Sequence, residues 1–203
     1  MKYILALLAT ASTLCYASTD APQDQSYTPP YISAKTGYFF FTSSTMNDVY
    51  TNNGLDLQLS SGYPIINFLR IYGSVEYCKR SGHSLGGNQK TSIWQLPLSL
   101  GLQPVVQICK STPIFTYLSL GPRYVFAHVN NDSNFVSRTM NSNGFGGFIN
   151  AGFQFIPIKH FLIDLFGEYS YTKLNFSSSV ANSTGNNTQV GGFTFGGGIG
   201  YAF

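Results

Sequence analysis

The chain ends in the stretch VGGFTFGGGIGYAF (residues 190–203), in which bulky and small residues alternate. Successive side chains of a β-strand point to opposite faces, so this pattern separates into two sets. One face carries Phe193, Phe195, Ile199, Tyr201 and Phe203, and the other carries Gly192, Thr194, Gly196, Gly198, Gly200 and Ala202. The stretch therefore predicts a strand with one bulky apolar face and one nearly bare face.

Seven earlier segments alternate in a similar way, and each is close to the ~9–11 residues that a tilted membrane strand needs. These segments are 31–42, 54–63, 67–79, 91–102, 114–126, 144–155 and 161–174. Connections rich in Asn, Ser, Thr and Gly (43–53, 80–90, 127–143 and 175–189) alternate with mostly shorter ones around Pro64, from Gln103 to Pro113 and around Pro157. An even number of antiparallel strands with long loops at one end predicts an all-β protein, an eight-stranded antiparallel transmembrane β-barrel.

The phase of the strands indicates which face meets lipid. In 91–102, Leu96, Leu98 and Leu100 lie opposite Gln95 and Ser99. In 161–174, the face opposite the apolar residues holds two carboxylates, at positions 164 and 168. A narrow interior that holds these carboxylates cannot also hold the apolar set, so we expect the apolar set to face outward into lipid. A soluble carrier of the lipocalin type would show the inverse arrangement.

The composition agrees with a membrane barrel and excludes two other classes. Of the 203 residues, 9% are charged and 16% are aromatic, and there are 21 Gly, whereas a soluble domain usually has about 25% charged residues. No run after the N-terminal segment reaches the ~18 apolar residues of a transmembrane helix, and the mean hydropathy is only +0.03. The net charge of +3 is too small and dispersed to indicate a nucleic-acid partner.

The N-terminus has the layout of a secretory signal peptide. Lys2 precedes a short apolar stretch, and Cys15-Tyr16-Ala17 places small residues at the −3 and −1 positions of a cleavage site. A lipoprotein cysteine at Cys15 is the alternative, but Ser12-Thr13-Leu14 lacks a leucine at −3 and a small residue at −1. We therefore expect three parts: a signal peptide (1–17), a polar disordered segment (18–30) and the barrel (31–203).

Two cysteines remain after cleavage, Cys78 and Cys109. The expected topology puts them at opposite rims of the barrel, too far apart to bridge each other. They are either free or paired with other chains in an oxidising compartment.

The same phase predicts which ionisable side chains point into the lumen. They are Lys35, Asp56, Arg70, Glu76, Arg123, Asp164 and Glu168. A narrow interior tolerates charges only when they are paired and hydrogen-bonded. We therefore predict an ion-pair network centred on Arg123 and Glu168, with Lys35 and Glu76 as close members and Arg70 and Asp164 as further members. This network is interpreted as a plug that closes the barrel, and the alternative is a small gated or low-conductance pore lined by the same charges.

The sequence offers no clear catalytic or metal site. The histidines left after cleavage are His83, His128 and His160, and none of them has the strand arrangement with serine that a lipid A deacylase would need. The two cysteines lack the spacing of metal ligands, so we predict no cofactor, metal or catalytic residue. Aromatic residues near strand ends are candidates for interfacial girdles: Tyr38, Phe40, Tyr72, Tyr77, Tyr124, Tyr171 and Tyr201.

Residues 31–203 resemble the small bacterial outer-membrane β-barrels that include the transmembrane domain of outer-membrane protein A and outer-membrane protein X. The resemblance rests on YISAKTGY (31–38), GPRY (121–124), FGEY (166–169) and the terminal GIGYAF (198–203). It implies an outer-membrane location, and an assembly signal at Gly198, Tyr201 and Phe203 that the barrel-assembly machinery recognises.

The resemblance leaves the function open, because one fold serves several functions. It implies contact with outer-membrane lipid and lipopolysaccharide, and loops 43–53, 80–90, 127–143 and 175–189 as candidates for binding a host or surface ligand. Our first hypothesis is a structural, surface-exposed barrel for interaction or adhesion. The second is a small-solute pore, and the third is a lipid A-modifying enzyme.

Overall fold

The computed structural model describes residues 28–50, 54–83, 89–109, 113–132, 139–176 and 186–203. Its elements are β1 (Tyr31–Phe41), α2 (Ser44–Val49), β2 (Gly54–Ile66), β3 (Leu69–His83), β4 (Lys90–Cys109), β5 (Ile114–Asn131), β6 (Thr139–Ile158), β7 (Phe161–Phe176), β8 (Asn186–Gln189) and β9 (Gly192–Ala202). The expected signal peptide, and the disordered segment up to residue 27, lie outside the described residues. In the part of the chain that is described, no helix has the length and apolar character needed to cross a lipid bilayer.

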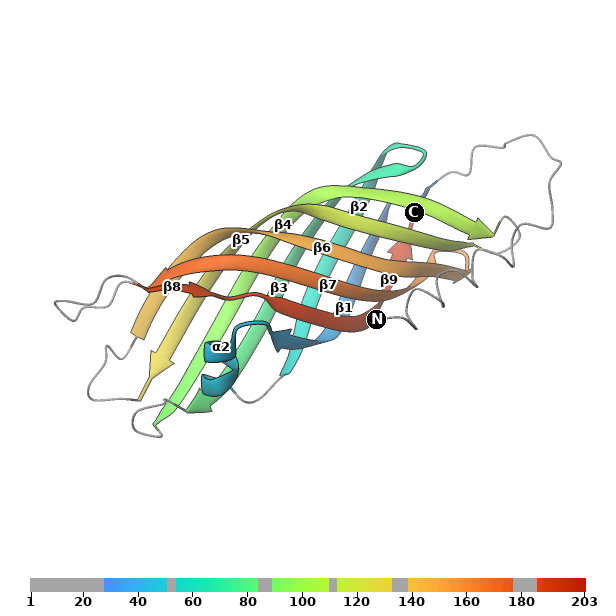
Figure 1. The fold of residues 1–203 in the computed structure, drawn as a ribbon. Helices are drawn as coiled ribbons and strands as arrows, with labels where there is room; N and C mark the ends of the chain where they lie inside the picture. Colours follow the sequence, from blue (N-terminus) through green and yellow to red (C-terminus); the bar gives the residue numbers. More distant parts are fainter. Residues whose placement is uncertain (1–27, 51–53, 84–88, 110–112, 133–138, 177–185) are drawn as a thin grey trace, which may run out of the picture.

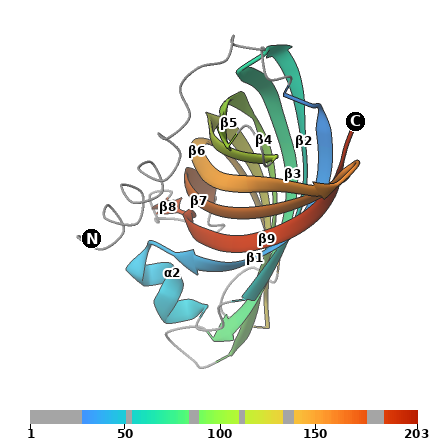
Figure 2. The same ribbon diagram turned by 90° about the vertical axis from the view of Figure 1, so that its right-hand side faces the viewer.

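The strands form a closed antiparallel ring (Figures 1 and 2). Each strand from β1 to β7 pairs with its neighbours in sequence, and the ring closes because β9 pairs with both β1 and β7. The short strand β8 pairs only with the outer part of β7, so β8 and β9 together make the eighth member of the ring. Around the described middle part of the ring, closure leaves no free sheet edge, as a barrel in lipid requires. The prediction of an eight-stranded antiparallel barrel is confirmed.

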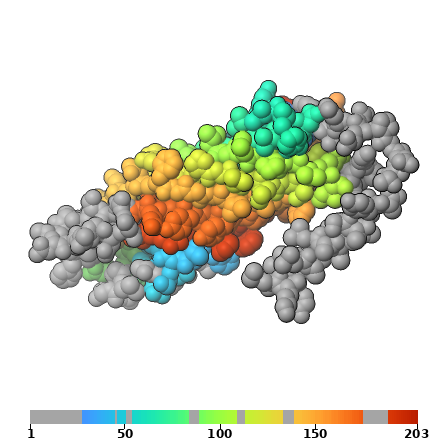
Figure 3. Space-filling view, turned by 45° about the horizontal axis from the view of Figure 1, so that its top comes forward, coloured from blue at the N-terminus to red at the C-terminus, as the bar shows by residue number. Residues whose placement is uncertain are grey.

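The outer wall of the barrel is apolar. Burial alternates along the strands, and the side chains that point outward are the bulky ones: Leu55, Phe145 and Ile199 are 68%, 70% and 60% exposed. Figure 3 shows this side wall, in which the strands from green to red lie side by side in one continuous surface. A monomeric soluble protein rarely exposes a contiguous apolar patch of more than a few hundred Å². The outer wall therefore requires an apolar environment around it, as the sequence pattern predicted.

The strands are longer than the sequence pattern predicts. The expected turn from Gln103 to Pro113 is mostly strand, because β4 continues to Cys109. The polar ranges taken as loops 80–90, 127–143 and 175–189 contain the ends of β3, β5, β6, β7 and the whole of β8. Beyond the apolar band both faces of a strand can be polar, so the alternation disappears while the backbone ladder continues. The predicted loops were therefore too long.

The two ends of the barrel are built differently. At the end where the short turns lie, residues 28–30 pack against the barrel: the Thr28 hydroxyl donates to the Asn67 carbonyl, and the Phe203 amide donates to the Pro30 carbonyl at 2.9 Å. Residues 28–30 thus make defined contacts, although they belong to the segment expected to be disordered. In the turn between β6 and β7, His160 has a φ of 70° and stacks on Tyr201 of the last strand at 4.8 Å. Figure 1 places α2 at the opposite end, away from the C-terminus.

Candidate functional site: the barrel lumen

The lumen holds equal numbers of opposite charges. Among the described residues, its buried cations are Lys35, Arg70, Arg80 and Arg123, and its buried carboxylates are Asp56, Glu76, Asp164 and Glu168. None of these side chains belongs to a residue more than 7% exposed. Because an unpaired charge in a low-dielectric interior is costly, the positions of the partners decide whether this interior is stable.

Arg123 on β5 joins two carboxylates across the middle of the lumen. Its Nη2 lies 2.5 Å from Glu76 Oε1 on β3 and 2.5 Å from Glu168 Oε1 on β7, and its Nε donates to Ser99 Oγ at 2.8 Å. Two neutral side-chain amides also donate hydrogen bonds to these carboxylates. Gln58 Nε2 donates to Glu76 at 2.9 Å, and Asn150 Nδ2 donates to Glu168 at 3.0 Å. One guanidinium therefore neutralises part of a pair of carboxylates that come from opposite sides of the ring.

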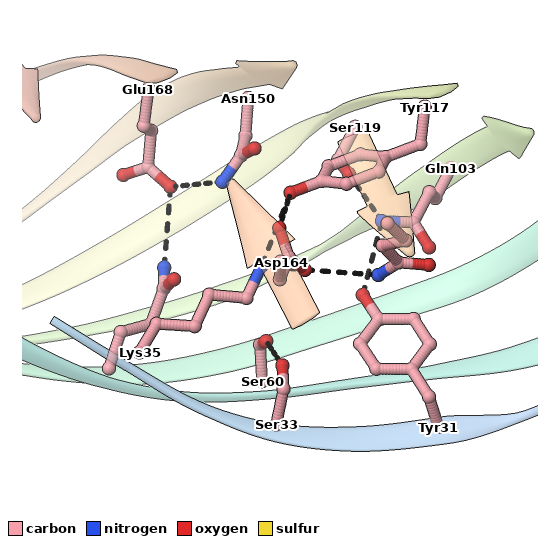
Figure 4. Close-up of polar contacts among 12 residues, drawn as sticks. Tyr31, Ser33, Lys35, Ser60, Gln103, Tyr117, Ser119, Asn150, Asp164 and Glu168 are labelled. Atoms are coloured by element: carbon pink, nitrogen blue, oxygen red, sulfur yellow. Dashed lines mark hydrogen bonds and ion pairs between the residues drawn. The ribbon is translucent and has the colours of Figure 1, made fainter. Parts of the chain in front are cut away.

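A second group surrounds Asp164 on β7 (Figure 4). Lys35 Nζ lies 2.8 Å from Asp164 Oδ2, Tyr117 Oη donates to Oδ1 at 2.7 Å, and Gln154 Nε2 donates to Oδ2 at 3.0 Å. The structure thus places Lys35 with Asp164, whereas the sequence interpretation placed it with the Arg123–Glu168 centre. The height of each residue in a barrel depends on the stagger of the strands, which side-chain phase does not reveal.

Arg70 is the exception in the expected ion-pair network. Among the described residues its guanidinium forms no ion pair. It donates instead to Gln154 Oε1 at 2.9 Å, Gln103 Oε1 at 3.3 Å and the Pro29 carbonyl at 2.8 Å. The prediction of Arg70 as an ion-pair member is corrected to a hydrogen-bonded cation that ties the N-terminal segment to the lumen.

Sequence reasoning missed one ion pair, between Arg80 on β3 and Asp56 on β2. Arg80 Nη2 donates to Asp56 Oδ1 at 2.7 Å, and both side chains are buried. Arg80 was overlooked because the third strand was expected to end at residue 79. In the structure the alternation of buried and exposed residues continues from Lys79 to His83, but every residue there is polar or small, so the sequence pattern does not reveal it.

Every lumen cation also lies over an aromatic ring. The distances from the charged group to the ring centroid are 5.0 Å for Lys35 over Phe166, 4.9 Å for Arg70 over Tyr31, 5.3 Å for Arg80 over Phe39 and 5.2 Å for Arg123 over Phe148. Such contacts contribute about 0.5–2 kcal/mol each, more where water is absent. Tyr72, which was expected in an interfacial girdle, is also inside: it is fully buried and contacts Phe148.

Glycines on the last strand make room for the Lys35 group. A Cβ at Gly198 would lie 2.7 Å from Lys35 Cγ and 2.5 Å from the Ala34 carbonyl oxygen. Gly198 was selected as part of an assembly signal, together with Tyr201 and Phe203, whose side chains are 45% and 64% exposed on the outer wall. The structure adds a packing role for Gly198.

The end of the lumen beyond Arg80 is apolar and is closed by α2. Met46 and Tyr50 pack into a buried cluster of inward side chains from several strands: Phe39, Phe41, Ile93, Val125, Ala127, Val129, Leu174 and Val190. The Asn47 amide donates to the Phe41 carbonyl at 3.0 Å and holds the helix to β1. Burial raises the pKa of the Tyr50 phenol, so this hydroxyl stays protonated. The range 43–53, which was expected to be a polar loop, thus contains the helix whose apolar residues Met46 and Tyr50 cap this end of the lumen.

The remaining candidate residues are dispersed. Cys78 is a free, buried thiol near the α2 end of β3, and Cys109 ends β4 at the opposite end. His160 Nδ1 lies 2.6 Å from the Ala202 carbonyl oxygen, and His128 Nδ1 lies 2.5 Å from Asn141 Oδ1. Within the described ranges, no three His, Cys, Asp or Glu side chains gather in a way that would hold a metal ion.

Comparisons with known proteins identify the fold. No family model matches the chain, and no curated protein sequence matches it. Among solved structures, OprG from Pseudomonas aeruginosa has a TM-score of 0.62 at 19% identity, over 88% of this chain and 98% of that one. Outer membrane protein W of E. coli has a TM-score of 0.57 at 15% identity, over 87% and 98%. Neisserial surface protein A has 0.54 at 16% identity, over 86% and 97%. The chain therefore has the fold of the small outer-membrane β-barrels.

Proposed function

We propose that this chain is an integral outer-membrane protein with a closed lumen, which acts as a rigid support for loops displayed at the α2 end. Support for the location comes from the apolar outer wall. On β4 the outward apolar residues run from Trp94 to Val106. At ~3.3 Å per residue and a tilt of ~40° this band covers roughly 30 Å, close to the hydrocarbon thickness of a bilayer.

The proposal of a closed lumen rests on one observation: the polar side chains of successive layers along the lumen are inaccessible to water. Five polar lumen residues are 0% exposed: Asp164, Arg70, Gln103, Gln154 and Asn150. A water-filled channel would leave the side chains that line it accessible to water. The layer around Asp164, the Arg123 layer, the Arg80–Asp56 pair and the α2 cap follow one another along the barrel, so a solute would have to displace all of them.

Planar-bilayer recordings of the purified, folded protein test this proposal. We expect no stable single-channel steps from the wild type, and none from Arg123→Ala, because the other layers remain. A control for folding is the change in gel mobility between heated and unheated samples. Stable steps from the wild type that grow in Arg123→Ala would instead establish the small gated pore, lined by the same charges.

The display function is supported by the asymmetry of the two ends. The connections at the α2 end span residues 42–53, 84–89, 132–138 and 177–185, whereas two of the three at the other end are only two residues long. Two proteins of the same fold carry surface roles in their names, Neisserial surface protein A and Ail, the attachment invasion locus protein of Yersinia pestis (TM-score 0.50, 19% identity).

A loop exchange tests the display function. Residues 133–138 are replaced by a Gly/Ser linker of equal length, which leaves β5 and β6 intact. Removing all of 127–143 would be unsuitable, because Ala127 and Val129 belong to the apolar cluster. We expect adhesion of cells that display the protein to fall while its folding is unchanged. Unchanged adhesion after exchange of each of the four loops would contradict the proposal.

A further inference from the structure

The outer face of β3, β4 and β5 changes from apolar to polar at one level. Lys79 on β3 is directly opposite Trp94 on β4, and Trp94 is directly opposite His128 on β5. The next outward residues toward the centre of the barrel wall are Tyr77 and Phe126, which are exposed aromatics. This row, Lys79–Trp94–His128, therefore marks the edge of the apolar band nearer the α2 end on three neighbouring strands.

The row is organised by direct contacts. The Trp94 and His128 rings stack at 5.5 Å with an interplanar angle of 28°. His128 Nδ1 lies 2.5 Å from Asn141 Oδ1, and because this oxygen only accepts, Nδ1 carries the proton. The Lys79 side chain is exposed beside this pair. The row thus presents two stacked rings, Trp94 and His128, and the Lys79 cation at the level where lipid headgroups begin.

Beyond the row, on its side nearer the α2 end, residues of the same three strands line an open hollow of about 420 Å³. Its lining residues are Ser81, Gly82, His83, Lys90, Thr91, Ser92, Asn130 and Asp132. His83 and Lys90 face each other across β3 and β4, and hydroxyl and amide groups surround them. Asp132 supplies the one carboxylate among these residues. Lys90 and Trp94 lie on one face of β4, so Lys90 is ~13 Å along the strand from the row.

We propose that the row and the hollow bind the phosphorylated headgroup of an outer-leaflet glycolipid, lipid A of lipopolysaccharide. Lys79 and Lys90 each contact a phosphate group, the polar lining of the hollow binds the sugar, and an acyl chain lies along the apolar wall below Trp94. This inference rests on the proposed outer-membrane location, and it adds a ligand site that the closed lumen does not need.

The location of the cations favours a lipid over a soluble polyanion. Lys79 lies on the side wall, next to the apolar band, where acyl chains and headgroups are neighbours, and Lys90 lies farther along on the same face of the wall. Another protein of this fold, Ail, has been solved with the heparin analogue sucrose octasulfate. A sulfated glycan in solution is therefore the competing ligand, and the experiment includes sucrose octasulfate as a probe.

The experiment uses the single tryptophan of the chain as its reporter. Trp94 lies within the row, so its emission senses a headgroup bound there. The full protein is inserted into phosphatidylcholine vesicles that contain increasing fractions of diphosphorylated lipid A, or of the same lipid A with its phosphates removed. We expect a saturable change of Trp94 emission with the phosphorylated lipid only. Native mass spectrometry counts the lipid that remains bound.

Charge variants decide where the phosphates bind. Each of Lys79→Gln and Lys90→Gln should weaken the apparent affinity by about five-fold, which corresponds to about 1 kcal/mol for a cation near the membrane surface. The matched control Lys159→Gln removes an exposed cation at the opposite end and should change nothing.

The proposal is overturned if phosphorylated and dephosphorylated lipid A give the same response, if Lys159→Gln weakens binding as much as Lys79→Gln, or if sucrose octasulfate saturates the site in neutral vesicles without lipid A. Failure of the wild type to insert into vesicles would instead refute the proposed membrane location, so the two failures are distinguishable.

Discussion

Replacing Arg123 by methionine would remove the one cation that joins Glu76 and Glu168 while keeping an unbranched side chain that matches the arginine as far as Nε. The substitution breaks two charge-assisted contacts of 2.5 Å and leaves two carboxylates facing each other in a buried layer. Removing one partner of a buried ion pair costs about 3–5 kcal/mol. Because two carboxylates lose their cation here, we expect the free energy of unfolding to fall by about 5 kcal/mol.

The triple variant R123M/E76Q/E168Q provides the internal test. It removes all three charges, and replacement of a whole buried charge group by neutral residues is often close to neutral in stability. We expect it to recover the wild-type free energy of unfolding to within about 1 kcal/mol. Urea titration of the protein in vesicles measures these values, with Trp94 emission and gel mobility as readouts.

A matched control is Lys159→Met, which removes an exposed cation and should stay within about 0.5 kcal/mol of the wild type. Two results would refute the reasoning. If R123M lost less than about 1 kcal/mol, the Arg123 layer would not be holding charges in a dry interior. If the triple variant were as unstable as R123M, the loss would come from packing around Arg123 and not from uncompensated carboxylates.

Three further outcomes follow from the lumen. Gly198→Val should lower the free energy of unfolding in urea by about 1–3 kcal/mol, because its Cβ would overlap the Lys35 side chain. Asp56→Asn should lower the heating midpoint of the gel-mobility change by leaving the Arg80 cation buried without a counter-charge, at a cost of about 3–5 kcal/mol, and a midpoint equal to the wild type would contradict this. Met46→Asp should speed amide hydrogen exchange in α2 while the strand amides stay protected, because it places a carboxylate in the apolar cluster.

The direction of each side chain was predictable because strand geometry has a period of two residues. Lys35, Asp56, Glu76, Arg123 and Glu168 are all buried in the lumen, as the alternation along their strands indicated. Alternation fails only where a strand leaves the apolar band, since both of its faces are then polar. This failure shortened the third strand and removed Arg80 from the expected set.

Pairing inside the lumen was not predictable from phase. Two inward residues meet only if they have the same height, and height depends on the stagger between strands. The residue directly opposite Lys35 on β9 is Gly198, and Gly198 is directly opposite Asp164 on β7. Because Gly198 has no side chain, the Lys35 and Asp164 side chains can meet over β9, the strand that lies between β1 and β7. Register brings Lys35 to Asp164, and no pattern within either strand encodes this.

The aromatic residues of the lumen were not predicted as a group, and Tyr72 was placed in the interfacial girdle although it is buried inside. Phe39, Phe148, Phe166 and Tyr31 belong to strands whose outward faces are also aromatic, so their composition alone suggests contact with lipid. In the structure each of them lies under a lumen cation. A ring accepts a cation on its face without carrying a charge of its own. The lumen thus supports four cations with four carboxylates and needs no further anion.

The order of the layers along the lumen explains why the charges and the apolar cap belong together. Water reaching the Arg123 layer from the α2 end would weaken its ion pairs, because their strength depends on a low local dielectric. Met46 and Tyr50 close this end together with inward apolar residues of the strands, and at the other end Arg70 donates to the Pro29 carbonyl. If the α2 cap keeps the interior dry, Met46→Asp should also reduce the stability lost in R123M, because hydrated carboxylates no longer need the guanidinium. A double-mutant cycle between the two positions should therefore show coupling, although Met46 and Arg123 belong to different layers.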